Sequence, residues 1–533
     1  MYIRIKRSGQ DGSYRYLQVV RSYREGGKVR QQVMVTLGRV EELVRSGTLD
    51  SLIEGLVRYS ERLRVVDVVG GGMAAREARA WGPTLIFDRL WREQGLPDIL
   101  RGLVEGRKFG FDVERVVFAL VLQRLCRPGS DLQGAGWLET VEGPGLDGLA
   151  LQHLYRATGF LAENRGRLEQ ALFDRERDLF TQTLDVVFMD TTSLYVYRDE
   201  ETAWRKRGYS RDRRSDLPQF VLGVVVTGSG WPISWEIFPG NTADPVALKS
   251  MVSKLRERFQ IGKVIVVADR GMISQEAIRF LEEHPEQPLE YILGCRMRRQ
   301  KEVREQVVSR AGRYKSAGEN LGVKEVRQGG KRYIICRNPQ EAEKDAQARE
   351  QILRHIEEAL AHHGAKSLIG NKGYARYLKV ARGSVTVNER AVKDDALLDG
   401  KFVLRTNTEL PAEDVAKTYK SLWRVERTFR EQKSTLEVRP IYHHRDDTSI
   451  GHIVASFLAL RLEVDLQRRL DERQVRVSWP DLMRDLQKVQ SVLVDLDGKR
   501  YRLRTDLKGT ASAIFAAVGV RPPSQVELLA SAS

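Results

Sequence analysis

The spacing of apolar residues divides the chain into strand-rich and helix-rich stretches. The apolar run 186–189 leads directly into Asp190, and the run 264–268 leads into Asp269. Uninterrupted apolar runs of this length are typical of strands that are covered on both faces. The pattern therefore predicts that each strand ends in a carboxylate held by a rigid element.

Further elements are predicted around these two strands. Two strands (219–227 and 231–238) and a helix from 244 to about 259, with Asp244 as its N-cap, separate the two aspartates. A short strand, a basic mixed segment that we interpret as an insertion, and a strand at 402–407 follow Asp269. The predicted order is three antiparallel strands, helix, strand, helix, strand, insertion, strand and helix. This is the order of a ribonuclease H-like (RNase H-like) nuclease core.

The last of these helices, which begins near Pro411, has an apolar stripe that contains a glutamate. Its members recur at intervals of three and four residues, and they are Val415, Tyr419, Leu422, Glu426, Phe429 and Lys433. The spacing predicts that Glu426 faces the core. Because an unpaired buried carboxylate is costly, a cation is expected beside it.

The first 38 residues alternate like a small antiparallel meander and are strongly basic. Strands are predicted near 2–6, 14–20 and 28–37. Two acids oppose eight basic residues, which are Arg4, Lys6, Arg7, Arg15, Arg21, Arg24, Lys28 and Arg30. Such a surface is either a DNA-binding sheet or a solvated basic face, and the pattern leaves both open.

Composition and charge narrow the class of protein. At 41% hydrophobic and 30% charged, the 533 residues are ordinary globular material with room for several domains. The net charge of +16 favours a polyanionic partner such as nucleic acid. Three dispersed cysteines indicate neither a disulfide framework nor a zinc knuckle. The sequence shows no signal peptide, membrane span or Gly-rich phosphate loop, so we expect a cytoplasmic protein that contacts no membrane and uses no ATP.

Together the patterns predict a multidomain α+β protein with an RNase H-like mixed-sheet core and a long insertion. Helical patterns near 84–94, at 113–125 with Asp112 as the N-cap, and at 165–179 predict a helical domain, and the GGG at 70–72 predicts a linker. The predicted regions are a basic N-terminal β/α DNA-binding region (1–65), an all-helical domain (71–180), the first part of the core (184–295), the insertion (296–400), the second part of the core with the catalytic helix (401–470), and a C-terminal region (471–533).

Three acids on these elements suit two-metal chemistry. Mg²⁺ prefers oxygen ligands, and two such ions about 3.5 to 4 Å apart stabilise the attacking and leaving oxygens of a phosphoryl displacement. In this interpretation Asp190 bridges both ions, while Asp269 and Glu426 each complete one. Each acid also has an ordinary interpretation, because a strand-end aspartate is often a turn or cap residue and Glu426 can pair with an arginine.

The motifs resemble those of the DDE transposases of bacterial insertion sequences, in the insertion-sequence-four superfamily. The resemblance covers about 184–462, with weaker similarity over the basic N-terminal segment. Four pieces carry it: FMDTTS around Asp190, FPGNTAD at 238–244, VVADRGMIS around Asp269, and YKSLWRVERTFREQKSTLEVRPIYH at 419–443. The family's helix signature is Tyr, Arg, Glu and Lys. Tyr419, Glu426 and Lys433 match it, whereas Leu422 stands at the arginine position, for which Arg424 or Lys420 can substitute.

The resemblance implies a bacterial transposase, found in the cytoplasm with the nucleoid, that cleaves DNA and transfers strands in a cut-and-paste reaction. Asp190, Asp269 and Glu426 would hold two Mg²⁺ ions, or Mn²⁺, per active site. A homodimer would pair the terminal repeats of the element in double-stranded DNA. Activated water would then nick each end, and the freed 3′-hydroxyl would attack next and finally join target DNA.

Aromatic and basic residues near the site are candidate DNA contacts. They are Tyr419, Trp423, Arg424, Arg430, Lys433, Arg270, Arg205, Lys206 and Arg207. Trp423 can stack on a displaced base or be a core tryptophan, and the loop 204–214 can contact phosphates or be solvated. His443 and His444 look like a metal or acid/base pair, but we favour a structural role because Mg²⁺ chemistry needs no histidine.

Two other functions remain open. One is another RNase H-like two-metal nuclease, against which the long insertion and the helix signature argue. The other is a non-catalytic, transposase-derived protein that binds specific DNA sequences, against which the three intact acids argue.

Overall fold

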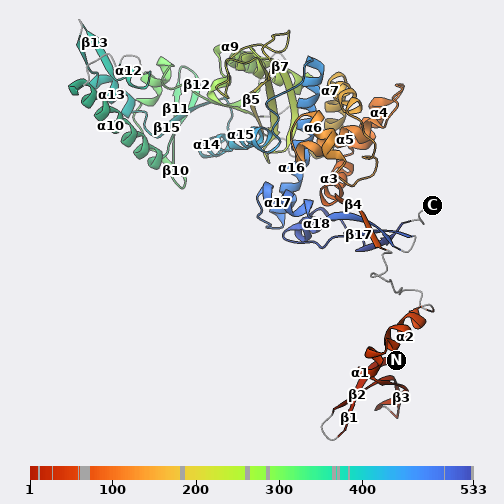
Figure 1. Cartoon of the computed structure of the whole chain (residues 1–533). Helices are drawn as coiled ribbons and strands as arrows, with labels where there is room; N and C mark the ends of the chain where they lie inside the picture. Colours follow the sequence, from red (N-terminus) through yellow and green to blue (C-terminus); the bar gives the residue numbers. More distant parts are fainter. Residues whose placement is uncertain are drawn as a thin grey trace. The chain divides into compact units, whose positions relative to one another are not determined.

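The computed structural model describes residues 1–9, 13–26, 28–57, 59, 73–180, 186–257, 265–283, 289–362, 368, 372–381, 384–496 and 499–529. The chain forms two compact units (Figure 1). One contains Met1–Ala78, Val492–Arg504 and Ser524–Ser533, and the other contains Arg79–Ser491 and Thr505–Pro523. The linker predicted at 70–72 lies outside the described residues.

The first unit contains the predicted antiparallel meander. Its strands are β1 (Tyr2–Ser8), β2 (Tyr14–Glu25) and β3 (Lys28–Arg39), in that order. They are longer than predicted because β2 and β3 stay paired through the polar residues 21–25. Two helices follow, α1 (Val40–Arg45) and α2 (Thr48–Val57).

A second sheet has the strand order β18-β17-β16-β4. Three of its strands come from the C-terminal part of the chain, and they are β16 (Gln490–Leu496), β17 (Lys499–Arg504) and β18 (Val526–Leu528). The fourth is β4 (Met73–Ala80), which corrects the prediction that 71–180 is entirely helical. Its alanines, glutamate and arginines favour a helix intrinsically, but pairing with β16 overrides that preference.

A single mixed sheet of nine strands organises the second unit, in the order β10-β11-β12-β15-β9-β8-β5-β6-β7. Five strands lie at one side of it: β5 (Val186–Tyr195), β6 (Gln219–Thr227), β7 (Pro232–Pro239), β8 (Ile265–Ala268) and β9 (Glu290–Gly294). The first three pair antiparallel, while β8 runs parallel to both β5 and β9. The predicted mixed α+β architecture is therefore confirmed.

Part of the segment predicted as an insertion extends this sheet. Strand β15 (Lys401–Thr406) pairs antiparallel with β9 on one side and with β12 (Lys331–Arg337) on the other. Beyond β12 come β11 (Leu321–Gln328) and β10 (Lys315–Gly318). The rest of the segment contains η2 (Val303–Val308), α10 (Pro339–His362), α12 (Lys372–Ala375), β13 (Leu378–Ala381), β14 (Ser384–Val387) and α13 (Glu389–Ala396).

Helices cover the sheet on both faces (Figure 1). Helix α8 (Asp244–Glu257) and helix α9 (Gln275–Glu282) pack with Val187, Met189 and Val225 in one apolar cluster. Phe188, Val224 and Val226 point to the opposite face and join a larger cluster. Because β5 alternates between these two clusters, its uninterrupted apolar run is explained by burial on both faces.

The larger cluster includes a layer of helices: α3 (Gly82–Glu93), α4 (Leu96–Val104), α5 (Val113–Cys126), α6 (Asp131–Leu138), α7 (Leu151–Phe180), α16 (Asp446–Glu472), α17 (Trp479–Gln487) and α18 (Ala511–Val518). Asp112 caps α5 as predicted, and its carboxylate accepts a bond from the Arg115 amide. None of the described helices is long and apolar enough to cross a membrane.

The helix predicted after Pro411 is interrupted. It consists of α14 (Ala412–Lys420), α15 (Trp423–Arg430) and the π-helical turn η3 (Glu431–Thr435). At the break, amides bond to carbonyls three residues back, from Leu422 to Tyr419 and from Val425 to Leu422. Such a turn advances by about 120° per residue instead of about 100°, so the side chains of α15 are rotated relative to those of α14.

Candidate active site

Asp190 and Asp269 emerge from neighbouring parallel strands. In the register of β5 and β8, Met189 lies opposite Ala268, so each aspartate occupies the next position along its strand. Asp269 follows the last residue of β8, as predicted. Asp190 does not end β5, however, because pairing with β6 continues from Asp190 to Tyr195. The two carboxylates are thus brought together where β8 stops and β5 continues.

The Asp190 carboxylate is in an environment that disfavours its charge. Burial raises its pKa to about 6, and the negative charges of Asp269 and Asp244 add to the effect. The Thr191 amide donates a 2.7 Å hydrogen bond to its Oδ1, and Arg211 Nη2 lies 3.7 Å from the same atom; both favour the charged form. These two contacts stabilise the charged carboxylate less than burial and the neighbouring negative charges destabilise it. A cation bound beside Asp190 would therefore be favourable.

Asp244 is a third acid at this point, and sequence reasoning assigned it only an N-cap role. Its Oδ1 instead accepts a 2.6 Å hydrogen bond from Thr191 Oγ1. The first helical amides of α8 bond to the Ala243 carbonyl, so Ala243 occupies the N-cap position. Asp244 lies in the FPGNTAD motif, which was the available signal for a role at the site.

Arg211 supplies the positive charge among these groups. Its Nη2 donates to Thr191 Oγ1 at 2.8 Å and to Asp244 Oδ2 at 3.1 Å. The Arg211 backbone amide also donates to Ser193 Oγ at 2.9 Å, which fixes the loop against β5. Sequence reasoning counted Arg211 only as part of the basic loop 204–214. The structure gives it a specific place beside the acids.

Tyr419 reaches Asp269 from helix α14. Its hydroxyl donates a 3.0 Å hydrogen bond to Asp269 Oδ1, and burial with the nearby carboxylate raises the pKa of Tyr419. The tyrosine was predicted to contact DNA, but this bond turns it toward the acids. A Cβ added at Gly294 would lie 2.3 Å from the Tyr419 oxygen, so only glycine leaves room for it.

Glu426 is exposed, which corrects the prediction that it lies on a buried face. The buried residues of α15 are Val425, Thr428 and Phe429. The reason is the tight turn at 421–422, which changes the phase of the helix and rotates Glu426 away from the core. Because Glu426 is exposed, burial does not require a cation beside its carboxylate. Helix α15 nevertheless packs against β5, which carries Asp190, and against its neighbour β6.

The three predicted acids do not form a compact ligand cluster. Across the described residues, one group of three ligating side chains has all its ligand atoms within 4.8 Å of one another, and it is Asp131, His443 and His452. Asp190 and Asp269 are close enough for the charge of one to affect the pKa of the other. Glu426 does not join them at this distance.

Lys433 anchors the loop 204–214 to η3. Its Nζ donates a 3.0 Å bond to Asp212 Oδ1, and Arg439 Nε donates a 2.9 Å bond to Asp212 Oδ2. Burial and the nearby charges of Arg439 and Arg211 lower the pKa of Lys433, although Asp212 opposes this. Lys433 was predicted to contact DNA, but its ammonium group is bound within the protein.

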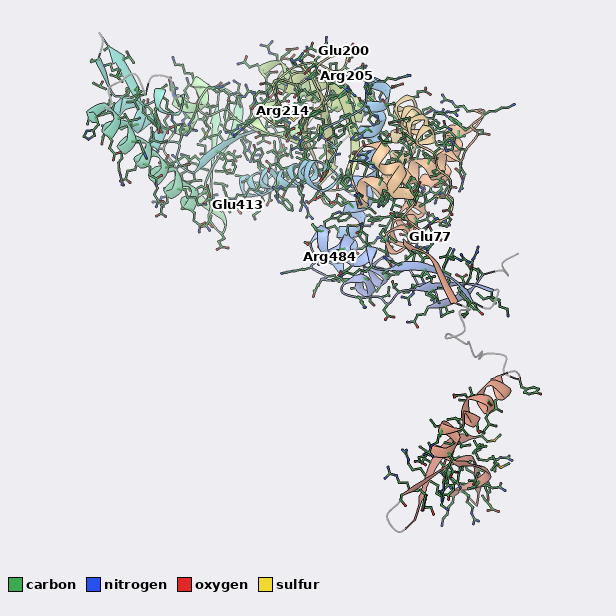
Figure 2. The ribbon with its side chains drawn as sticks, in the orientation of Figure 1. Glu77, Glu200, Arg205, Arg214, Glu413 and Arg484 are labelled. Carbon is green, nitrogen blue, oxygen red and sulfur yellow. The ribbon has the colours of Figure 1, made fainter. Side chains whose placement is uncertain are left out.

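The other predicted DNA contacts differ in how accessible their side chains are. Arg205 is buried and pairs with Asp446 at 2.8 Å, so it is not available to DNA and that prediction is wrong. Figure 2 labels Arg205 in the second unit, together with Glu200 and Arg214. Lys206 and Arg207 lie close to the Glu201 carboxylate. Trp423 is 51% exposed, which excludes the core-tryptophan alternative. The side chains of Arg270, Arg424 and Arg430 are at least partly exposed.

Comparison with known protein families gives two matches. Residues 181–462 match the family model of the transposase DDE domain, which covers both aspartates, Glu426 and the sheet that carries them. Residues 3–67 match the N-terminal domain of the IS1634 family transposases. No curated protein matches the chain.

Proposed function

Because this chain belongs to the DDE transposases of insertion sequences, we propose that it binds the ends of its element and catalyses DNA cleavage and strand transfer. Asp190, Asp269 and Glu426 are assigned as the catalytic triad. The observation that carries the proposal is the placement of Asp190 and Asp269 at equivalent positions of neighbouring parallel strands. Two carboxylates placed in this way attract a divalent cation.

The core is assigned as RNase H-like. The strand order β7-β6-β5-β8-β9, with three antiparallel strands followed by two parallel ones, supports this assignment. The first acid is on the central strand β5, and the second follows its parallel neighbour β8. The helix that carries Glu426 packs on β5, the strand that carries Asp190, and on its neighbour β6.

The donor set fits Mg²⁺ or Mn²⁺, because all three side chains offer carboxylate oxygens. Two ions held by Asp190, Asp269 and Glu426 would activate the attacking hydroxyl and stabilise the leaving oxygen of the phosphodiester. The raised pKa of Asp190 is consistent with a site that is balanced by cations. Tyr419 orients Asp269 through its hydrogen bond, and Arg211 supplies counter-charge beside Asp190.

DNA is assigned to two surfaces. Exposed Trp423, Arg424 and Arg430 follow the same helical segment as Glu426, and Arg270 follows Asp269, so these groups would meet DNA that reaches the acids. The basic three-stranded sheet of the N-terminal region is assigned to recognition of the element's ends. A homodimer that pairs two ends completes the proposal, since both ends must be cut before they are joined.

The test compares purified wild-type protein with Glu426→Gln on end DNA of the element in the presence of Mg²⁺. Products are resolved on a denaturing gel, and end binding is measured separately by a mobility shift. We expect wild-type protein to cut at the element boundary and Glu426→Gln to bind the ends without cutting. Glu413→Gln is the matched control, because it makes the same change in the first turn of α14, at a residue that is not assigned to the triad, and it should cut normally.

Each alternative function has its own outcome. Cleavage without any joining to target DNA, under conditions where ends are paired, would favour another two-metal nuclease. Binding by wild-type protein without metal-dependent cleavage would favour a non-catalytic DNA-binding protein. Cleavage by Glu426→Gln at the wild-type rate would remove Glu426 from the site.

A further inference from the structure

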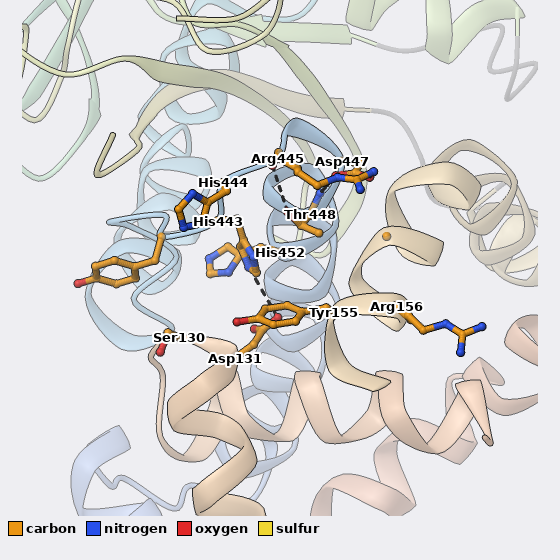
Figure 3. Close-up of a pocket in the computed structure, with 12 residues that line it drawn as sticks. Ser130, Asp131, Tyr155, Arg156, His443, His444, Arg445, Asp447, Thr448 and His452 are labelled. Carbon is orange, nitrogen blue, oxygen red and sulfur yellow. Dashed lines mark hydrogen bonds and ion pairs between the residues drawn. The ribbon is translucent and has the colours of Figure 1, made fainter. Parts of the chain in front are cut away.

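Three ligating side chains meet at a second place, away from the carboxylates of the proposed active site. Asp131 begins α6, His452 lies in α16, and His443 lies in the segment between η3 and α16. They are 2%, 4% and 9% exposed, and their ligand atoms all lie within 4.8 Å of one another. Figure 3 shows them beside a cavity of about 530 Å³ that Tyr155 and His444 also line.

His452 has one ring nitrogen without a hydrogen-bond partner among the described residues. Its Nε2 lies 2.9 Å from the carbonyl oxygen of Val438, and because a carbonyl can only accept, Nε2 carries the proton. The lone pair is therefore on Nδ1. That atom is buried, and no hydrogen-bond partner for it exists in the part of the chain that the structure describes. A ring N–H donated to a backbone carbonyl is the usual support of a metal-binding histidine.

Asp131 keeps acceptor capacity on its second oxygen. Oδ1 accepts a 3.0 Å bond from Arg124 Nη2, and Oδ2 accepts a 3.3 Å bond from Thr158 Oγ1. His443 Nε2 lies 3.7 Å from Oδ2, which is too long for a direct hydrogen bond. Two ligands of a tetrahedral Zn²⁺ ion, each about 2.0 Å from the metal, lie about 3.3 Å apart. The observed separation is thus close to that of two atoms bound to one ion.

We propose that Asp131, His443 and His452 bind one Zn²⁺ ion, with the cavity providing the fourth position. Two imidazole nitrogens and one carboxylate oxygen suit Zn²⁺, whereas Mg²⁺ prefers oxygen ligands alone. Arg124 offsets part of the Asp131 charge and orients the carboxylate. The site is distinct in ligands and in metal from the proposed Mg²⁺ centre, so either assignment can fail without the other.

The consequence of the ion is structural. It ties α6 to α16 and holds the segment that follows the helix of Glu426 against the helical layer. His452 already bonds to that segment through the Val438 carbonyl. Zinc would add a second link through His443, so its loss should loosen the junction between the core and the helical layer.

The test measures zinc by mass spectrometry in full-length protein that was loaded with Zn²⁺ and dialysed against a weak chelator. Wild-type protein should retain about one ion per chain, and His443→Gln should retain almost none. His355→Gln is the matched control, because His355 is exposed on α10, where its ring lies against the Gln351 carbonyl and does not line the cavity. Asp190→Asn should also retain zinc, since it alters only the oxygen-ligand centre.

A second measurement covers the case in which His443→Gln does not fold. Co²⁺ bound to the wild-type protein should give the visible absorption bands of a tetrahedral site with nitrogen ligands, and equimolar Zn²⁺ should remove them. Absence of zinc and of these bands in the wild-type protein would overturn the proposal. Retention of zinc by folded His443→Gln at the wild-type level would do the same.

Discussion

The hydroxyl of Tyr419 donates a 3.0 Å hydrogen bond to the carboxylate of Asp269, across 150 residues of sequence. Because hydrogen bonds to ionised groups contribute about 1.5 to 3 kcal/mol, losing this one should weaken the site by about 10- to 100-fold. We predict that Tyr419→Phe lowers the cleavage rate by that factor and raises the Mg²⁺ concentration needed for half-maximal rate. End binding should stay unchanged. Tyr442→Phe is the control, because the ring of Tyr442 is half-exposed and does not contact Asp269 in this way. An equal loss of cleavage in both variants would contradict a role for the Tyr419 hydroxyl.

Gly294 leaves the space that the Tyr419 hydroxyl occupies, since a Cβ there would lie 2.3 Å from its oxygen. Gly294→Ala should displace the tyrosine and reduce cleavage at least as much as Tyr419→Phe. The double variant should be no worse than Gly294→Ala alone, because both changes act on the same bond. The measurement compares the cleavage rates of Tyr419→Phe, Gly294→Ala and the double variant. Gly322→Ala, in the same sheet, is the control. Additive losses would show that Gly294 acts through another contact.

The raised pKa of Asp190 makes the stability of the metal-free protein depend on pH. Its pKa is about 6 in the fold against an ordinary value of 3.8, so the fold binds the proton more tightly than the unfolded chain does. The favourable contribution of the protonated group is complete below about pH 4 and is lost as the pH rises through about 6. A difference of this size corresponds to about 3 kcal/mol at most.

Asp190→Asn should therefore stabilise the metal-free protein at pH 8 and have little effect at pH 4. Thermal unfolding in the presence of a chelator, at both values, measures this. Addition of Mg²⁺ at pH 8 should raise the Tm of the wild-type protein and not that of the variant. A Tm for Asp190→Asn below that of the wild-type protein at pH 8 would show that the charged carboxylate is well stabilised without metal.

Arg211 places its positive charge beside two acids, because its Nη2 lies 3.7 Å from Asp190 Oδ1 and 3.1 Å from Asp244 Oδ2. Arg211→Ala should lower the Tm of the metal-free protein, because the acids lose their counter-charge. The increase in Tm on addition of Mg²⁺ should be larger than for the wild-type protein, since no guanidinium competes with the ion. Arg213→Ala, in the same loop but exposed, should behave as wild type. A smaller response to Mg²⁺ in Arg211→Ala would indicate that Arg211 supports metal binding.

Trp423 exposes 51% of its surface three residues before Glu426. If a base stacks on the indole, removing the indole should cost about 1 to 3 kcal/mol of binding free energy, which corresponds to a roughly 5- to 150-fold increase in Kd. Trp423→Ala should weaken binding to end DNA with an unpaired base at the cleavage site by that factor, whereas Trp423→Phe should retain most of it. Binding is measured by fluorescence anisotropy. If Trp423→Ala binds this DNA as tightly as Trp423→Phe does, the indole does not stack on the base.

The sequence by itself determined features that depend on residues close together in the chain. The apolar runs before Asp190 and Asp269 identified both strands, because burial on two faces leaves no polar positions. Asp112 was identifiable as an N-cap, since a cap bonds to an amide three residues ahead. The family resemblance rested on short motifs, and both family matches agree with it.

Only the tertiary structure decided which distant groups meet. A periodic stripe assumes an unbroken helix, and the tight turn at 421–422 moved Glu426 to the surface. In the sequence Arg205 is one more basic residue of the loop, whereas in the fold it is buried and pairs with Asp446, 241 positions away. Asp131 and His452 likewise lie on separate helices that only packing brings together. Helix and strand formation depends on neighbours in sequence, whereas charge pairing, burial and ligand geometry depend on neighbours in space.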